Sequence, residues 1–267
     1  MYDNQRRLAM IIKRDFIYTP NGKNRPLHIY LPDDYFESNE QYPVMYFFDG
    51  HNLYNNEDAT YGKSWGLREF LENWPKKMII VGIQCSLEGQ DRLSEYLPYP
   101  ADPGYFAQFK PMGEATFDWI VNEIKPMIDK EFRTYPFREC TGIAGASMGG
   151  VMAIYGGVHY NQWFSKAACV SSAISFCMGP LMKDMEETYM NPDTRMYLSW
   201  GTKEVRGLEN VWEEDTHSYC YRNNKAVADK AKEAGAATML DCHVGGGHCE
   251  ADWEQLVPHF MDFLWMR

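Results

Sequence analysis

Residues 141–155 read TGIAGASMGGVMAIY, a run of small and apolar residues that changes character at Ser147. Residues 142–146 are typical of a buried strand, and the residues from Gly149 onward are typical of a helix. Gly145, Ser147 and Gly149 therefore form the pattern G-x-S-x-G at a predicted strand-to-helix turn. The glycines let neighbouring backbone approach closely, and the strained turn presents the serine hydroxyl at the carboxyl end of a sheet.

A serine presented in this way is typical of a catalytic nucleophile. The amide of Met148 would face the point where an oxyanion forms, and the following helix adds positive potential there. The alternative is a tight glycine turn whose serine only caps the helix. The strand-to-helix context favours the nucleophile, so we expect Ser147 to be catalytic and Met148 to supply one oxyanion amide.

Short apolar runs alternate with amphipathic stretches on both sides of this turn. Strands are expected at residues 44–48, 78–83, 142–146, 167–170, 196–200 and 239–244. Helices are expected at residues 67–74, 115–132, 149–159, 225–234 and 252–266. Strands that are apolar on both faces and separated by helices predict an α/β fold, a mostly parallel twisted sheet with helices on both faces.

The N-terminal part has a different pattern. Residues 9–18 and 27–31 are strand-like and are separated by the turn sequence PNGKN, which predicts an antiparallel hairpin at one edge of the sheet. No internal repeat or Pro/Ser-rich linker divides the chain, so we expect residues 1–267 to form a single domain. An antiparallel hairpin that leads into such a sheet is the layout of an α/β-hydrolase, a fold that does not by itself establish function.

Composition narrows the class of protein. Apolar residues make up 45% of the 267 residues, enough for a sizeable core, and the net charge of −11 disfavours nucleic acid and anionic membranes as partners. No apolar run reaches the length of a bilayer span, and the first twenty residues, which begin at Met1, hold no secretory segment, so we expect a cytoplasmic protein. The seven cysteines form no C-x-x-C pair and no metal-ligand spacing, so we expect reduced thiols and no metal.

A nucleophilic serine needs a general base, and the base needs an orienting acid. In this layout both follow the serine, in the order acid then histidine. His248 lies on the glycine loop after the last predicted strand and is the expected base, with His243 inside the strand pattern as the alternative. Glu204 is the first carboxylate after the strand at 196–200 and is the expected acid. The same acidic segment holds the other candidate carboxylates, Glu209, Glu213, Glu214 and Asp215.

Fewer signals identify the rest of the site. The strand at 44–48 leads into a glycine turn, so the backbone N–H of His51 is the candidate for the second oxyanion amide. Arg92 either contacts substrate or pairs with Glu95 inside a loop, and we favour the ion pair.

Three further residues are candidates for the substrate pocket. Met178 belongs to a methionine-rich stretch, residues 176–189, that could adapt to a ligand, although ordinary packing is the favoured interpretation. Trp65 and Trp212 are either aromatic platforms for a sugar or phenolic ring or parts of the core.

Together these segments resemble the putative-esterase group of the α/β-hydrolase superfamily, which includes esterase D-like enzymes, feruloyl and acetyl-xylan esterases, enterochelin esterases and secreted mycolyltransferases. The resemblance covers the chain from about Asp15 to its end. The matching segments are FFDGHNLY at 47–54, GKSWG at 62–66, EIKPMIDKEFRT at 123–134, GIAGASMGG at 142–150, WGTKE at 200–204 and GGHCEADW at 246–253.

The resemblance implies a serine carboxylic-ester hydrolase with Ser147 as nucleophile, His248 as base and Glu204 as acid. The amides of His51 and Met148 would form its oxyanion hole, and no cofactor is implied. Many members carry Asp where this chain has Glu204. The implied substrates are small acyl esters of sugars or phenolics. The alternatives are acyl transfer to an alcohol, as in the mycolyltransferases, a siderophore esterase, and a non-catalytic binding protein that keeps the fold.

Overall fold

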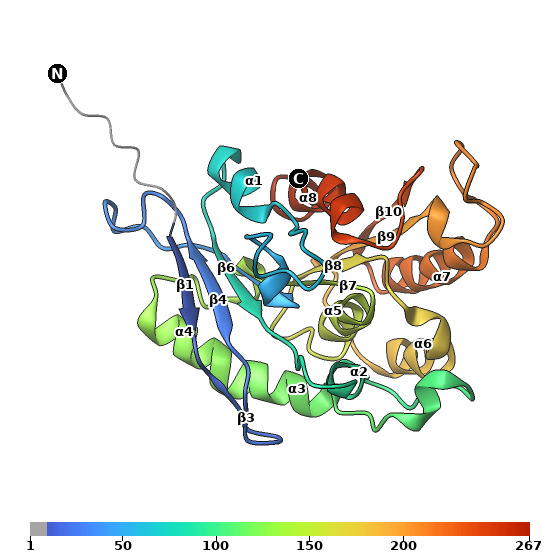
Figure 1. The fold of residues 1–267 in the computed structure, drawn as a ribbon, viewed down its shortest axis with the longest axis horizontal. Helices are drawn as coiled ribbons and strands as arrows, with labels where there is room; N and C mark the ends of the chain where they lie inside the picture. Colours follow the sequence, from blue (N-terminus) through green and yellow to red (C-terminus); the bar gives the residue numbers. More distant parts are fainter. Residues whose placement is uncertain (1–9) are drawn as a thin grey trace.

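The computed structural model describes residues 10–267 of the chain (Figure 1). Its strands are β1 (Met10–Arg14), β2 (Ile17–Tyr18), β3 (Lys23–Asn24), β4 (Leu27–Leu31), β5 (Val44–Phe48), β6 (Ile79–Ile83), β7 (Thr141–Ala146), β8 (Lys166–Val170), β9 (Arg195–Gly201) and β10 (Ala237–His243). Its helices are α1 (Leu67–Asn73), α2 (Asp91–Glu95), α3 (Gly113–Trp119), α4 (Lys125–Glu131), α5 (Met148–Val158), α6 (Met178–Glu187), α7 (Tyr219–Glu233) and α8 (Glu250–Trp265). Ala9, where the first predicted strand begins, lies outside the described residues.

Eight strands form one sheet in the order β1-β4-β6-β5-β7-β8-β9-β10. β4 runs antiparallel to both of its neighbours, and every other pairing in this sheet is parallel. The segment predicted as one N-terminal strand is divided into β1 and β2, and β2 pairs with β3 in a separate two-stranded ladder. The predicted α/β fold, with a mostly parallel sheet and an antiparallel N-terminal hairpin, is confirmed.

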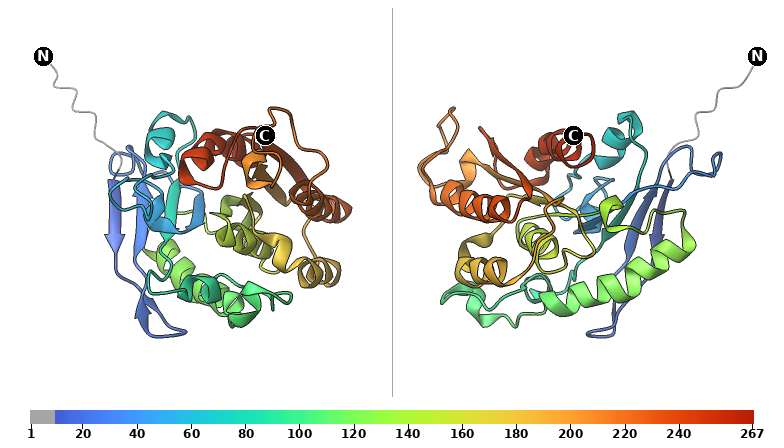
Figure 2. Two further views of the ribbon diagram at one scale, coloured as in Figure 1. Left: turned by 45° about the vertical axis from the view of Figure 1, so that its right-hand side comes forward. Right: turned by 180° about the vertical axis from the view of Figure 1, so that it is seen from behind.

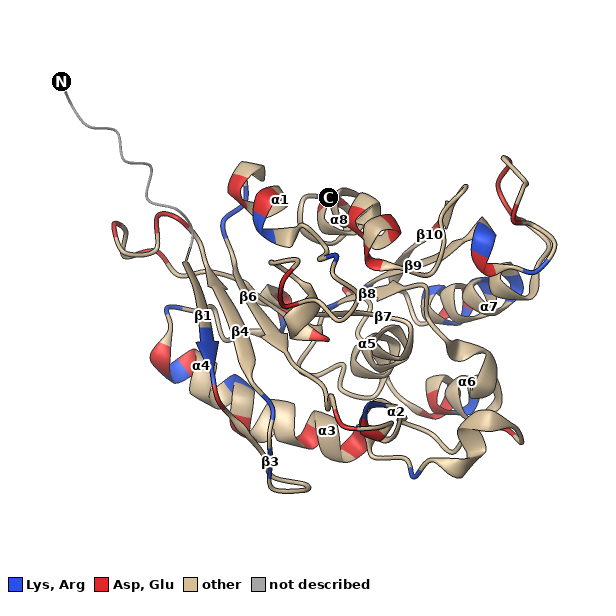
Figure 3. Ribbon diagram, in the orientation of Figure 1, with Lys and Arg blue, Asp and Glu red and all other residues tan. Residues whose placement is uncertain are grey.

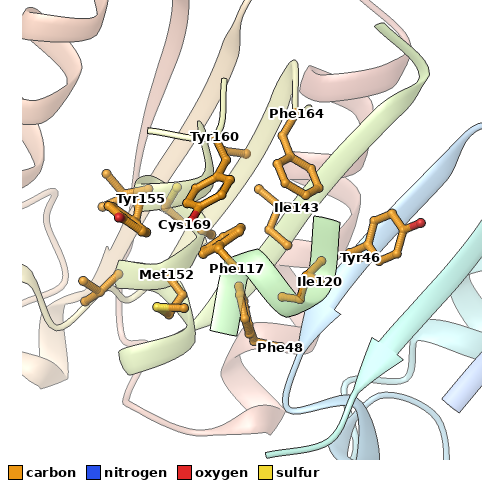
Figure 4. Close-up of a cluster of buried hydrophobic side chains, with 14 of the residues drawn as sticks. Tyr46, Phe48, Phe117, Ile120, Ile143, Met152, Tyr155, Tyr160, Phe164 and Cys169 are labelled. Atoms are coloured by element: carbon orange, nitrogen blue, oxygen red, sulfur yellow. The ribbon is translucent and has the colours of Figure 1, made fainter. Parts of the chain in front are cut away.

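Helices cover both faces of the sheet (Figure 2). Alternate residues of β5 face opposite sides of the sheet. Tyr46 and Phe48 belong to the larger core cluster together with side chains of α3 to α7, whereas Met45 and Phe47 belong to a second cluster with α1 and α8. All four side chains are buried, which explains why β5 is apolar along its whole length. In the larger cluster, Phe117 of α3 lies against Phe48 (Figure 4).

One continuous helical segment corresponds to the helix predicted at residues 115–132. α3 passes through a π-helical turn at Ile120–Ile124 into α4. Most of the apolar stripe along this segment, including Phe117 and Ile128, is buried in the larger core cluster, and Met127 is partly buried against it. The helical periodicity therefore identified the face that covers the sheet.

Two helices lie where the sequence pattern indicated none. α2 has only five residues, too few for a periodic pattern. α6 occupies the methionine-rich stretch, and its Leu181 and Met185 are buried in the larger core cluster, so these side chains are used for packing. Charged residues are concentrated on the outer helices and loops (Figure 3). No helix within residues 10–267 is both long and apolar enough to cross a bilayer.

Candidate active site

The turn between β7 and α5 holds Ser147 in a backbone conformation that is rare for a residue with a side chain. Its φ is 58° and its ψ is −119°. A Cβ on Gly145 would lie 2.5 Å from the carbonyl oxygen of Gly149, and a Cβ on Gly149 would lie 3.0 Å from the Cβ of Phe48. Glycine is required at Gly145 because any side chain there would displace backbone, which explains the G-x-S-x-G spacing.

Backbone hydrogen bonds fix this turn to the end of β8. The N–H of Ser147 donates to the carbonyl of Val170 over 3.0 Å, and the carbonyl of Ser147 accepts from the N–H of Ala173 over 3.1 Å. Met148 is the first residue of α5, so its N–H has no partner within the helix. The serine is thus held at the carboxyl end of β7 by structure on two sides.

His248 and Glu204 meet at the same edge of the sheet, after β10 and β9. His248 Nδ1 lies 2.8 Å from Glu204 Oε2. Because a carboxylate only accepts hydrogen bonds, Nδ1 carries the proton of the neutral imidazole, and Nε2 keeps a free lone pair. The His248 ring also stands edge-on to Trp253 of α8, with ring centroids 5.1 Å apart. The imidazole is therefore oriented by one hydrogen bond and one ring contact.

Ser171 holds the other oxygen of Glu204. Glu204 Oε1 accepts hydrogen bonds from the Ser171 hydroxyl over 2.7 Å and from the N–H of Gly201 over 2.9 Å. Ser171 Oγ in turn accepts from Trp253 Nε1 over 3.1 Å. Ser171 follows β8 and has a positive φ of 43°. Ser171 was not predicted from the sequence, although it lies directly after a buried strand, the same signal that made Glu204 a candidate.

The other candidate acids and the other candidate base lie away from this contact. Asp215 accepts a hydrogen bond from Trp200 Nε1 over 3.0 Å and further ones from backbone N–H groups before α7. Glu209 accepts from the N–H of Gly207. His243 is the last residue of β10. The structure brings Glu204 to His248 and leaves these residues with other partners or positions.

Ser147 and His248 line the same cavity, which has a volume of about 420 Å³. The side-chain hydrogen bond of His248 within residues 10–267 goes to Glu204 and not to Ser147. His248 also borders a neighbouring cavity of about 310 Å³, whose wall includes Glu204 and Ser171. The imidazole thus lies between two cavities, and Ser147 lines the larger one.

His51 lies in the turn after β5 and lines the Ser147 cavity. The turn starts at Asp49, whose φ of 57° is left-handed, and continues as one 3-10 turn over Gly50–Asn52. The His51 imidazole is buried and its Nε2 lies 2.8 Å from Thr60 Oγ1. Burial lowers the pKa of His51, which favours a neutral ring. The ring is engaged within its own loop, so a contribution of His51 to chemistry would come from its backbone N–H.

Arg92 forms an ion pair, but with a different partner from the one predicted. Its Nε and Nη2 donate to the two carboxylate oxygens of Asp49 over 2.8 and 2.7 Å. The predicted Arg92–Glu95 pair is wrong, because the segment forms the short helix α2 and Glu95 turns into the core to bind Arg25. Burial acts to raise the pKa of Asp49, but the charge and hydrogen bonds of Arg92 outweigh it and hold that pKa below its usual value. Arg92 and Asp49 both line the Ser147 cavity.

Glu250, the first residue of α8, lines the Ser147 cavity and was not predicted from the sequence. Its side chain is only 4% exposed, and its Oε1 accepts a hydrogen bond from Asn52 Nδ2 over 3.1 Å. Burial raises the pKa of Glu250, and the charge of Asp49 adds to this effect. Because no ion pair within residues 10–267 neutralises it, Glu250 is an uncompensated carboxyl two residues from His248.

The three candidate pocket residues are placed differently. Trp65 is buried, packs against Trp253 with ring centroids 5.6 Å apart, and contributes to the wall of the Ser147 cavity. Met178 begins α6 and packs against the larger core cluster. Trp212 is 74% exposed and lies beside Gly245. Of the three, the structure brings only Trp65 to Ser147.

Comparison with known proteins places the chain among esterases. The sequence profile of the family described as Putative esterase matches residues 20–263. The chain is 25% identical to the Bacillus subtilis "Uncharacterized protein YbbA" over 215 aligned residues. The aligned region covers 79% of this chain and 80% of that protein. It is 28% identical to "Esterase MT1326" of Mycobacterium tuberculosis over 159 aligned residues. This aligned region covers 58% of this chain but only 30% of that longer protein.

Several solved structures share the fold. An IroE-like serine hydrolase from Shewanella oneidensis has a TM-score of 0.70 at 20% identity, over 95% of this chain and 81% of that chain. The enterobactin esterase FES from Shigella flexneri has a TM-score of 0.71 at 16% identity, over 96% of this chain and 59% of that chain. A ferulic acid esterase has a TM-score of 0.67 at 18% identity, over 96% of this chain and 97% of that chain. The family profile matches nearly the whole length of the chain, and the fold agrees with it. The chain therefore belongs to the Putative esterase family of α/β-hydrolase enzymes.

Proposed function

We propose that this chain is a serine carboxylic-ester hydrolase in which Ser147, His248 and Glu204 form the catalytic triad. The observation that carries the proposal is the 2.8 Å contact between His248 Nδ1 and Glu204 Oε2, at the edge of the cavity that contains Ser147. This contact leaves Nε2 as the atom that can accept the serine proton. A rotation of the Ser147 side chain toward Nε2 would complete the triad when substrate enters.

The proposed reaction has two steps. Ser147 Oγ attacks the ester carbonyl carbon while His248 Nε2 takes its proton, and the N–H groups of His51 and Met148 stabilise the oxyanion. His248 then gives the proton to the departing alcohol, which leaves the acyl group on Ser147. Water activated by the same imidazole hydrolyses this acyl-enzyme. Glu204 keeps the imidazole in the required tautomer and stabilises its charged form without taking the proton.

We propose small acyl esters of sugars or phenolics, of the acetyl or feruloyl type, as substrates. The support is the cavity of about 420 Å³, a volume suited to a small ligand, whose wall combines the ring of Trp65 with the polar groups of Arg92 and Glu250. A similar solved structure is titled a ferulic acid esterase. The second candidate is a siderophore ester, which is favoured by the likeness to the enterobactin esterase FES.

The test is hydrolysis of p-nitrophenyl acetate by the Ser147→Ala variant. We expect loss of p-nitrophenol release to the level of the uncatalysed reaction, because the nucleophile is gone. Ser94→Ala, which changes a serine of α2, serves as the matched control and should retain activity. Turnover by Ser147→Ala at the rate of the parent enzyme would overturn the proposal. A panel of acetyl, feruloyl and enterobactin esters then separates the candidate substrates.

A further inference from the structure

A further cavity, of about 350 Å³, lies at the opposite end of the sheet from Ser147, and we call it the amino-end cavity. Its wall includes Lys166 and Arg195, the first residues of β8 and β9, whereas Ser147 follows the last residue of β7. α8 starts at Glu250 on the wall of the Ser147 cavity and ends at Trp265 on the wall of this one. Its 16 residues span about 24 Å, so the two cavities are separate.

The amino-end cavity is positively charged in an acidic protein. Four cationic side chains line it, those of Lys76, Lys166, Arg195 and Arg267, against two carboxylates, the side chain of Glu139 and the C-terminal carboxylate of Arg267. The chain as a whole carries a net charge of −11. Within residues 10–267, none of these four cations makes an ion pair with a carboxylate. A concentration of unpaired positive charge is therefore a specific feature of this cavity and not a consequence of composition.

Backbone carbonyl groups hold three of these cations in place. Lys76 Nζ donates to the carbonyl of Trp265 over 3.0 Å, and Arg195 Nη1 donates to the carbonyl of Phe263 over 2.9 Å. Lys166 Nζ donates to the carbonyl of Glu139 over 2.6 Å and to Ser165 Oγ over 2.9 Å. Two of these carbonyls belong to the last turn of α8, whose partial negative charge compensates only part of the positive charge. Each cation keeps further N–H donors for a ligand.

Lys166 is partly buried beside these charges. Its pKa falls to about 8, chiefly because the side chain is buried; the nearby charges of Arg195 and Lys76 also lower the pKa, whereas Cys140 and Asp193 act to raise it. Lys76 and Lys166 also share the Trp265 ring, with Nζ atoms 5.7 and 4.8 Å from its centroid. The fold thus keeps several cations together in a partly dry site, at a cost that a bound anion would remove.

We propose that the amino-end cavity binds a phosphate-bearing anion. Four cationic side chains against two carboxylates leave an excess of two positive charges, which matches a ligand with more than one negative charge, and the remaining N–H donors on the cavity wall match the several acceptor oxygens of a phosphate group. A volume of about 350 Å³ leaves room for a small organic group beside the phosphate. The site is independent of the proposed esterase chemistry, because it shares no residue with the cavity of Ser147.

The experiment is calorimetric titration of the intact chain with inorganic phosphate, with ionic strength held constant by chloride. We expect saturable binding at one site, weakened about tenfold or more in Arg195→Met and in Lys166→Met, because each loses a charge-assisted hydrogen bond. Lys183→Met, which changes an exposed lysine of α6, is the matched control and should bind as the parent does. Ser147→Ala should also bind normally, which separates this proposal from the esterase proposal. Absence of saturable binding, or equal affinity in all variants, would overturn it.

A second measurement on the unmodified chain covers the case in which a variant fails to fold. Bound phosphate should slow reductive methylation of Lys166 several-fold and leave Lys183 unchanged, with both sites measured by mass spectrometry. Equal rates at Lys166 with and without saturating phosphate would contradict the proposal, as would equal slowing by chloride alone. Titrations with glycerol 3-phosphate and with inorganic phosphate distinguish an organic phosphate ester from free phosphate as the ligand. Tighter binding of glycerol 3-phosphate would show that the rest of the cavity contacts the organic group.

Discussion

Glu204 has every oxygen engaged, and this defines what the residue can do. Oε2 lies against His248, while Oε1 accepts hydrogen bonds from Ser171 and from the backbone of Gly201. Three donors converge on one carboxylate, so the group cannot rotate away from the imidazole without losing hydrogen bonds in a mostly buried setting. We therefore expect the carboxylate to act as a rigid support that selects one His248 tautomer.

Replacing this carboxylate by an amide should remove most of the activity. In Glu204→Gln the side chain can present its NH₂ group to Nδ1, which would then have to act as an acceptor and leave the proton on Nε2. We expect kcat to fall roughly 10³–10⁴-fold, with a much smaller change in KM. Steady-state kinetics on p-nitrophenyl acetate measures both parameters.

Asp215→Asn is the matched comparison for Glu204→Gln. Asp215 binds Trp200 and backbone N–H groups before α7, so its loss should affect stability more than kcat. We expect kcat within about threefold of the parent at a temperature where the variant is folded. A large loss of kcat in Asp215→Asn with a small loss in Glu204→Gln would show that the acid has been assigned to the wrong residue.

Glu250 should make stability depend on pH in the opposite direction from an ion-paired carboxylate. Its native pKa is raised by burial and by the charge of Asp49, so the native state holds a proton that the unfolded chain has already released. The free energy of unfolding should therefore fall as pH rises from about 4.3 toward the native pKa. Glu250→Gln has no such proton, so its stability relative to the parent should rise over this window and then level off. Urea unfolding at a series of pH values tests this, and parallel curves for the two proteins would contradict it.

These residues also show which parts of a site a sequence reveals. The strand-to-helix turn at Ser147 could be predicted because it tolerates only glycine at Gly145, so the backbone geometry restricts the sequence. The partner of Arg92 could not, since Asp49 is 43 positions away and the contact depends on how α2 meets the end of β5. Glu250 was missed because its burial arises from the packing of α8 beside Asn52, which no local pattern encodes.

At the scale of the elements, α5 depends on glycines for its packing as well as for its start. A Cβ on Gly156 would lie 2.6 Å from the ring of Phe117, so α5 approaches α3 more closely than alanine permits. In α6, by contrast, a Cβ on Gly179 would meet no atom within 4 Å. The two helices therefore give opposite expectations for the same substitution.

Gly156→Ala should destabilise the protein by about 1–3 kcal/mol, because the methyl group overpacks the interface between two helices. Gly179→Ala should stabilise it by about 0.5 kcal/mol, because alanine loses less backbone entropy in a helix. Equilibrium unfolding in urea compares the two variants with the parent. Stabilisation by Gly156→Ala would show that α5 and α3 are less tightly packed than the structure indicates.

Elements with regular patterns were easier to predict than short or amphipathic ones. β5 and the long segment of α3 and α4 are apolar in patterns set by the sheet and by the helical repeat, so their positions followed from the sequence. The methionines of α6 have the same helical spacing, but a stretch rich in methionine is also typical of a binding surface, and the helix itself was not predicted. Composition alone did not separate these two uses.

At the scale of the whole molecule, the two core clusters share the same strands. Tyr46 and Phe48 face one cluster, and Met45 and Phe47 face the other. Unfolding of the strands that border one cluster would therefore expose the apolar side chains of the other. We propose on this ground that the chain is a single cooperative domain. Urea unfolding followed by tryptophan fluorescence and by far-UV circular dichroism should give coincident transitions, whereas separate midpoints would indicate two independent units.

The most direct test of the proposed chemistry is to find where a fluorophosphonate reacts. Such a probe couples to a serine whose proton is removed by a neighbouring base, so we predict one adduct, on the peptide that contains Ser147. Labelling should disappear in Ser147→Ala and slow by several orders of magnitude in His248→Asn. An adduct on another serine, or unchanged labelling of Ser147→Ala, would contradict the assignment of Ser147 as the nucleophile.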